Sequence, residues 1–160
     1  MHYERYGELA RFMCFNNLCN TSGQSCIEVS KEETILSAAG IMMKAFANTE
    51  AAWPLRIEGY EADSLKSIEM QVSWNLDRTK LVINLVNKCD EEAWITLDLS
   101  KLAIQGNSMK TFKLVGDGAA QETIRNHGNI HESVTYRSID TTLPYTFQAS
   151  AFSFQEIVIG

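Results

Sequence analysis

The feature that most constrains this chain is a change in the spacing of its apolar residues near Trp53-Pro54. Before that point, apolar residues recur every three or four positions, as on the buried face of a helix. From about residue 65 onward they alternate with polar residues, as on a strand with one buried face. A helix repeats about every 3.6 residues and a strand every two. The chain is therefore expected to contain two kinds of structure in succession.

The part before the change predicts two short helices. The first covers about 4–20 and ends at Thr21-Ser22-Gly23. The second follows Ser30-Lys31-Glu32-Glu33, which has the form of a capping box, with Ser and Glu side chains bonding the free amides of the first turn. A regular apolar stripe continues this helix to about Asn48, and its Met and Phe side chains are typical of packing rather than of a cofactor site.

The part after the change predicts strands with one buried face. Ile68, Met70 and Val72 alternate with polar residues, and the run that begins at Leu81 behaves in the same way. Many short strands joined by polar turns are typical of a β-sandwich. The expected fold class is therefore mainly β, an antiparallel jelly-roll-like sandwich preceded by two short helices. The later strands are expected at Ile95–Leu99, Lys110–Val115, Gln121–Ile124, Ser133–Tyr136, Thr146–Gln148 and Phe152–Ile159.

Charge and cysteine content narrow the function classes. The net charge is −6 and the Lys and Arg residues are scattered, which argues against a nucleic acid or an anionic membrane as partner. No apolar run approaches the ~20 residues of a membrane span, and the first residues lack the apolar centre of a signal peptide. Cys14, Cys19 and Cys26 have no second pair at zinc-site spacing, which favours free thiols and the cytoplasm over secretion, although the compartment stays open.

Three groups of side chains could carry chemistry, and each also has an ordinary structural interpretation. Asp90-Glu91-Glu92 could be an acid/base pair, but neighbouring residues of a strand point to opposite faces, which favours a charged hairpin turn. His127 and His131 are four residues apart, but the Gly-Asn between them favours a loop over a metal-binding helix. No metal or cofactor is therefore expected.

The third group is aromatic. Trp53, Tyr60, Trp74 and Trp94 could form a platform on which a sugar stacks. Trp74 and Trp94 fall in alternating segments, where packing within the sandwich is the more common role. Exposure of these rings in the structure would favour glycan binding, and burial would count against it.

Several segments, taken in their order, resemble a known family. The sequence LVINLVNKCDEEAWITLDL (81–99) looks like the strand–Asn–turn–strand signature of family 51 glycoside hydrolases, the α-L-arabinofuranosidases. GDGAAQETIRNHGNIHESV (116–134) and FQASAFSFQEIVI (147–159) resemble the next segment and the closing strand of their C-terminal domain. RFMCFNNLCNTSG (11–23) and ETILSAAGIMMKAFANTE (33–50) are similar to the end of their catalytic barrel and to the helix after it.

The resemblance implies two parts, a helical lead-in at 1–54 that matches the end of a catalytic barrel and a C-terminal β-sandwich at 55–160. In the family two Glu residues act as acid/base and nucleophile of a retaining hydrolase, and the acid/base Glu follows an Asn. This sequence contains no Asn-Glu dipeptide. We therefore expect the chain alone to be inactive, with no catalytic residue of its own.

One substrate-binding residue follows from the resemblance. Asn17, in NNLCN, falls where the family has a Gln at the sugar pocket. An Asn could also donate to a sugar hydroxyl with a shorter reach, but it could equally bridge nearby backbone groups. The loops before Val134 and before the last strand lack the family's prolines, which leaves the paths of those loops open.

The leading hypothesis is a C-terminal fragment of an arabinofuranosidase-like enzyme that releases terminal arabinofuranosyl residues from plant polysaccharides. Its expected partners are the catalytic barrel of the same enzyme, an arabinose-containing glycan in the intact protein, and a second copy of itself. The alternative is a non-catalytic carbohydrate-binding or protein-interaction sandwich module. Exposed apolar surface on the lead-in would favour the fragment.

Overall fold

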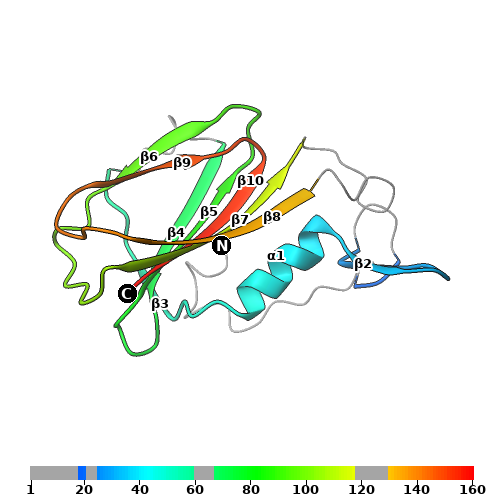
Figure 1. Ribbon diagram of the computed structural model, residues 1–160, viewed down its shortest axis with the longest axis horizontal. Coiled ribbons are helices and arrows are strands. Elements are labelled where there is room, and N and C mark those ends of the chain that lie inside the picture. Colours follow the sequence, from blue (N-terminus) through cyan, green and yellow to red (C-terminus); the bar gives the residue numbers. More distant parts are fainter. Residues whose placement is uncertain (1–17, 21–24, 60–66, 118–129) are drawn as a thin grey trace.

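The computed structural model describes residues 18–20, 25–59, 67–117 and 130–160. Within them a small two-stranded sheet and a helix lie on opposite sides of a larger six-stranded sheet (Figure 1). The elements in chain order are β1 (Ile27–Val29), β2 (Thr34–Leu36), α1 (Ala38–Ala47), β3 (Trp53–Leu55), β4 (Ile68–Trp74), β5 (Leu81–Asn87), β6 (Ala93–Leu97), β7 (Ser108–Gly116), β8 (Ile130–Ser138), β9 (Tyr145–Ala149) and β10 (Ser153–Ile159).

Three antiparallel sheets in the described residues, one of them the β1–β2 hairpin, confirm the expected mainly β fold. The large sheet has the order β3-β4-β5-β10-β7-β8 and the small one pairs β6 with β9. Inward side chains of β4, β5 and β10 meet those of the small sheet in one buried core. The alternation predicted for this region is confirmed, since Ile68, Met70 and Val72 all lie in that core together with Leu81. The strand expected at Gln121–Ile124 lies outside the described residues.

The lead-in differs from the expectation of two helices, because the described residues contain one. Most of the first expected helix lies outside them, and Cys19, at its end, forms a bridge with Ile27 instead. Ser30 does form a cap, but of the turn between β1 and β2, where its hydroxyl accepts from the amides of Glu32 and Glu33 at 3.2 and 3.0 Å. A capping sequence stabilises a tight turn as well as the start of a helix, because both present free backbone amides to the Ser hydroxyl.

The helix α1 begins seven residues later than the capping box suggested. Ser37 is its N-cap, and its hydroxyl accepts from the amide of Gly40 at 3.2 Å and donates to the carbonyl of Ser25 at 2.6 Å. Asn48 is the C-cap, which agrees with the expected end. The Thr-Ile pair expected to lead this helix lies in β2.

The helix packs on the face of the large sheet that points away from the small sheet. The ring of Phe46 lies 5.3 Å from that of Phe154 on β10. Met42 and Ala38, four and eight residues before Phe46, line a shared pocket with Phe154, so one stripe of the helix faces the sheet. The central strands β5 and β10 of the large sheet are therefore covered on both faces, by the small sheet on one and by α1 on the other, while the edge strand β8 is exposed.

The proposed division at residue 54 falls inside β3, which pairs with β4 through Trp53↔Trp74. The division itself stays a prediction. In the part of the chain that the structure describes, no helix is long and apolar enough to cross a membrane.

Candidate functional site

Asn17, the residue expected at a sugar pocket, lies outside the described residues, as do Cys14, Tyr60 and His127. Its role therefore stays a prediction. The remaining residues singled out in the sequence can be placed.

The acidic cluster does not converge on one point. Asp90-Glu91-Glu92 lies in the connection between β5 and β6. The carbonyl of Glu91 accepts from the side chain of Asn87 at 2.8 Å, while the carboxylate of Glu92 accepts from Gln148. These contacts are those of a structural turn. His131 lies on β8 and pairs with Asp117 at 3.2 Å.

The tryptophans do not form a single platform. Trp53 and Trp74 are cross-strand neighbours on β3 and β4, at one edge of the large sheet. The Trp53 indole donates to the carbonyl of Leu76 at 3.1 Å and lies 5.4 Å from the guanidinium of Arg78. Trp94 stands on the other sheet and is 70% exposed. Only Trp94 thus presents most of its ring to solvent.

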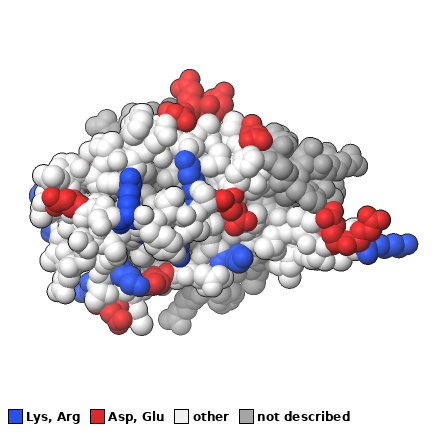
Figure 2. Space-filling view, in the orientation of Figure 1, with Lys and Arg blue, Asp and Glu red and all other residues white. Residues whose placement is uncertain are grey.

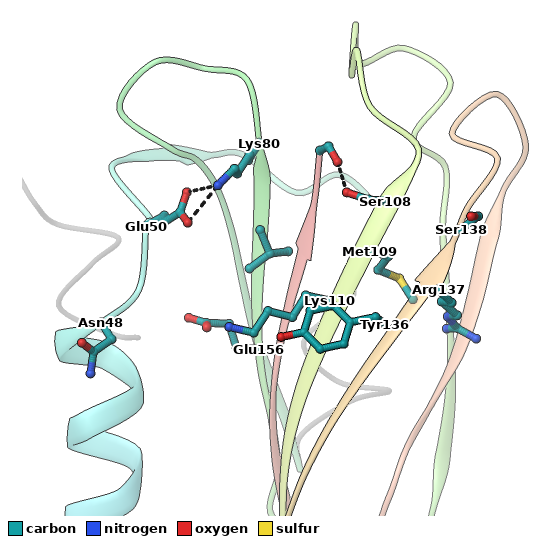
Figure 3. A pocket seen from close by; sticks show the side chains of 12 residues that line it. Asn48, Glu50, Lys80, Ser108, Met109, Lys110, Tyr136, Arg137, Ser138 and Glu156 are labelled. Carbon is teal, nitrogen blue, oxygen red and sulfur yellow. Dashed lines mark hydrogen bonds and ion pairs between the residues drawn. The ribbon is translucent and has the colours of Figure 1, made fainter.

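A cavity of about 430 Å³ lies where the chain leaves α1 and meets the large sheet. Its lining comes from the end of the helix, from β7, β8 and β10, and from the turn between β4 and β5 (Figure 3). At its rim the ammonium of Lys80 bonds both carboxylate oxygens of Glu50, at 2.9 and 2.8 Å. The side chains of Lys110 and Tyr136 point across the sheet toward Glu156.

Behind this cavity, polar side chains are buried in register. Gln71, Asn84 and Glu156 are direct neighbours on β4, β5 and β10, and all face the side that carries α1. Asn84 is 1% exposed and Glu156 is 9% exposed. Both polar atoms of the Asn84 amide and Oε2 of Glu156 are buried without a hydrogen-bond partner in the part of the chain that the structure describes. Such groups cost free energy, so they mark a place where the fold is not optimised for stability alone.

Sequence reasoning did not find this row. Each residue is an ordinary polar residue on the face of a strand opposite the core, where solvent is the default expectation. The signal in the sequence was the apolar residues on either side of them on the same strand face. Val82 and Val86 flank Asn84 on its own face, and Phe154 and Val158 flank Glu156, which indicates a covered face.

The described residues that line the cavity do not include the carboxylate pair of a retaining glycosidase. Of its two lining carboxylates, Glu50 is held by Lys80, which leaves Glu156 as a single carboxylate. Catalysis of that kind needs a second carboxyl ~5–5.5 Å away. In the described ranges, no cluster of His, Cys, Asp and Glu could hold a metal ion.

Two carboxylates with shifted pKa values lie away from this cavity. The hydroxyl of Ser100, followed by its amide, lowers the pKa of Asp98. The hydroxyl and amide of Thr142 lower the pKa of Asp140 in the same way. In both cases the donor lies two residues after the Asp and bonds the ionised form, which identifies a turn cap rather than a catalytic acid.

The described surface carries no continuous basic stripe in the view of Figure 2. Lysines and arginines are separated by uncharged surface, and acidic side chains gather at the upper rim and at the tip of the β1–β2 hairpin. This distribution agrees with the net charge of −6.

Comparisons with solved structures identify the architecture. The chain matches the GH51 α-L-arabinofuranosidase of Thermotoga petrophila with a TM-score of 0.64 and 15% identity over 89% of its length. The arabinose-bound MgGH51 α-L-arabinofuranosidase gives 0.65 and 16% over 89%, and the GH51 enzyme of Xanthomonas axonopodis pv. citri gives 0.63 and 10% over 89%. The chain has the fold of part of a GH51 arabinofuranosidase. No protein-family model matches the sequence, and no curated protein matches it.

This GH51-like chain is much shorter than those enzymes. It spans 32%, 23% and 30% of the three chains, in the order given above. The match includes the lead-in as well as the sandwich, since it covers 89% of this chain. The resemblance of the sequence to family 51 is therefore confirmed at the level of the fold.

Proposed function

We propose that this chain is the C-terminal accessory region of an α-L-arabinofuranosidase-like retaining glycoside hydrolase. In the intact enzyme it supports a catalytic barrel that releases terminal arabinofuranosyl residues from plant polysaccharides. The observation that carries the proposal is the likeness to GH51 enzymes over 89% of this chain and 32% of the matched one. Most of this chain matches, yet it corresponds to less than a third of the matched enzyme, as expected for an accessory region.

Exposed apolar side chains supply a surface for the barrel. Leu18, Val29, Leu36 and Met43 are all exposed, and they belong to the β1–β2 hairpin, the segment bridged to it, and α1. Val29 and Leu36 lie on the same face of the hairpin by its register. We call these four residues the lead-in patch. Large exposed apolar groups in one structural unit are typical of an interface that this chain alone does not complete.

The test begins with the coding sequence upstream of Met1. An open frame that encodes a barrel with two strand-end Glu residues is expected. Co-expression of that barrel with this chain should restore cleavage of p-nitrophenyl α-L-arabinofuranoside, because the barrel supplies the reacting carboxylates and this chain supplies its support. The chain alone should release nitrophenol no faster than buffer.

Two controls sharpen the result. A barrel in which its two Glu residues are changed to Gln should stay inactive with this chain present. Cleavage by the chain alone, lost in Glu156→Gln, would overturn the accessory role, because it would place catalysis in the cavity beside α1.

A further inference from the structure

The face of the large sheet that points toward the small sheet, here called the inner face, is apolar at one end of the strand order and polar at the other. On β4 and β5 it is apolar and buried under the small sheet. On β7 the buried core ends at Met109, and beyond it the same face of β7 and β8 carries polar side chains, namely Thr111, Lys113, Ser133, Thr135 and Arg137. A core laid open by a missing strand would show apolar side chains here. The face is instead polar where the small sheet no longer covers it, which is typical of a surface that contacts water or a polar ligand.

This face forms one wall of a groove of about 590 Å³ that opens between β7–β8 and the strand β9. Its volume is within the range of ligand-binding sites. Thr111 and Thr135 are direct neighbours at the middle of the wall, with Arg137 two residues along β8 on one side and Lys113 two residues along β7 on the other. At ~3.3 Å per residue, the backbone positions of these two residues are ~13 Å apart along the strands, a length that suits a short oligosaccharide.

Both cations are held in place by neutral groups. The guanidinium of Arg137 lies 5.1 Å from the centre of the Tyr145 ring and donates to the Tyr145 hydroxyl. The ammonium of Lys113 donates to the hydroxyl of Ser150. Neither has a carboxylate partner among the described residues. In a chain of net charge −6, positioned cations without counter-charges favour an anionic ligand.

An exposed aromatic ring and hydrogen-bonding groups complete the groove. Trp94 is 70% exposed and lies at its edge. The side chains of Gln148 and Gln155 line it as well, and Gln155 already donates to the carbonyl of Gln148 at 2.9 Å. An indole face binds the apolar face of a sugar ring, while hydroxyls and amides bind its hydroxyl groups. Among the described residues that line the groove none is acidic, and the carboxylate of Glu92 accepts from Gln148, one of these lining residues.

We propose that this groove is a glycan-binding site for a carboxylate-bearing oligosaccharide, one that contains a uronic acid. Trp94 stacks on a sugar ring, the Thr111–Thr135 wall binds hydroxyl groups, and Arg137, whose planar guanidinium matches a carboxylate, binds the carboxylate. The wall of the groove is the face of the large sheet opposite α1, although Tyr136 and Arg137 line both the groove and the cavity beside α1. The groove needs no residue of a barrel. The glycan-site proposal is therefore independent of the proposed accessory role.

The experiment is a calorimetric titration of the full chain at low salt with two probes. One is xylotriose substituted with glucuronic acid, and the other is the same xylotriose without it. The acidic probe should bind about tenfold more tightly or better, because one charge-assisted hydrogen bond is worth about that factor. The difference should shrink in 0.5 M NaCl, at which screening is strong. Equal affinities for the two probes would remove the basis for a carboxylate contact.

Three variants locate the site. Arg137→Gln should remove most of the preference for the acidic probe while leaving affinity for the neutral one, and Trp94→Ala should weaken both about tenfold or more. Lys110→Met is the matched control, since Lys110 lies on the other face of β7 and should leave both affinities unchanged. No binding of either probe at millimolar concentration, by a chain with an unchanged melting curve, would overturn the groove as a glycan site. Barrel association, tested separately, would be unaffected.

Discussion

Two buried asparagines on β5 separate the contribution of a side-chain amide from that of its position. The amide of Asn87 donates to the carbonyls of Glu91 and Ala149 at 2.8 and 3.3 Å and accepts from the amide of Cys89 at 3.0 Å. The amide of Asn84, three residues earlier, is as deeply buried and has no partner. The first ties a turn and two strands together, and the second only loses its hydration.

We expect Asn84→Leu to raise the free energy of unfolding by about 1 kcal/mol, because it replaces an unpaired buried amide with an apolar side chain of similar size. Asn87→Leu should lower it by about 2 kcal/mol, because three hydrogen bonds are lost in a buried place. Urea unfolding measures both. A loss of stability in Asn84→Leu as large as that in Asn87→Leu would mean that the Asn84 amide has a partner in solution.

The turn that follows β6 allows the pKa of one carboxyl group, that of Asp98, to be tested. Ser100→Ala should raise the pKa of Asp98 toward its ordinary value, because the hydroxyl is the largest cause of its lowering. The shift should be incomplete, since the amide of residue 100 still bonds the carboxylate. A carboxyl with a folded pKa below its unfolded pKa stabilises the fold above the unfolded value, and the contribution is lost as pH falls through the folded value. An NMR titration of Asp98 measures the shift, with Asp140 as the unchanged control.

At the scale of elements, the contact between α1 and the lead-in hairpin depends on one glycine. A Cβ at Gly40 would lie 2.1 Å from the carbonyl oxygen of Cys26. Gly40 is inside a helix, where Ala is ordinarily the better residue by about 1 kcal/mol. The close backbone approach reverses that preference. Gly40 therefore fixes the helix against Cys26, the residue immediately before β1.

Gly40→Ala should therefore destabilise the chain by about 2 kcal/mol, through the backbone shift that the clash forces. Ala39→Gly, at the exposed neighbouring position, should cost about 1 kcal/mol by helix propensity alone. Circular dichroism at 222 nm during thermal unfolding compares the two. If Gly40→Ala melted at a higher temperature than the unchanged chain, the close packing of α1 on the hairpin would be wrong.

The edge strand β8 illustrates another constraint on an element. From His131 to Ser138 its side chains are exposed on both faces, and its pairing partner is β7 on one side. The charged side chains of Glu132 and Arg137 along it oppose edge-to-edge pairing of two copies. A homo-oligomer, which the sequence resemblance allowed, stays a prediction.

At the scale of the whole molecule, the lead-in patch should decide association with the barrel. Val29→Lys combined with Met43→Lys places two charges in it, and we expect the affinity for the co-expressed barrel to fall by more than about tenfold, because each charge must be desolvated to bind. The stability of the chain should change little, since both side chains are exposed. Sedimentation velocity of the mixture measures this.

A control with the same chemistry lies elsewhere on the surface. Leu143, between β8 and β9, is exposed and belongs to a turn outside the patch. Leu143→Lys should leave association unchanged. If it weakened association as much as the double variant, the barrel would bind the sandwich rather than the lead-in.

The sequence by itself determined the elements whose burial follows from their own pattern. Alternation along β4, β5, β7, β9 and β10 predicted strands, because in a strand the period of two decides which side chains meet the core. It also predicted the end of α1 at Asn48. It could not place the start of the helix, because a Ser-Glu cap suits the β1–β2 turn as well as a helix and only the contact of Ser37 with Ser25 selects the later start.

The tertiary structure alone decided which faces of the large sheet are covered. Gln71, Asn84 and Glu156 are buried together because strands distant in sequence pair in one register and α1 lies on that face. Arg137 and Lys113 face one groove because the register of β7 with β8 places them on the same face, opposite β9. The pattern of a strand specifies its two faces, but what lies against each face depends on the order of strands in the sheet, which local sequence does not encode.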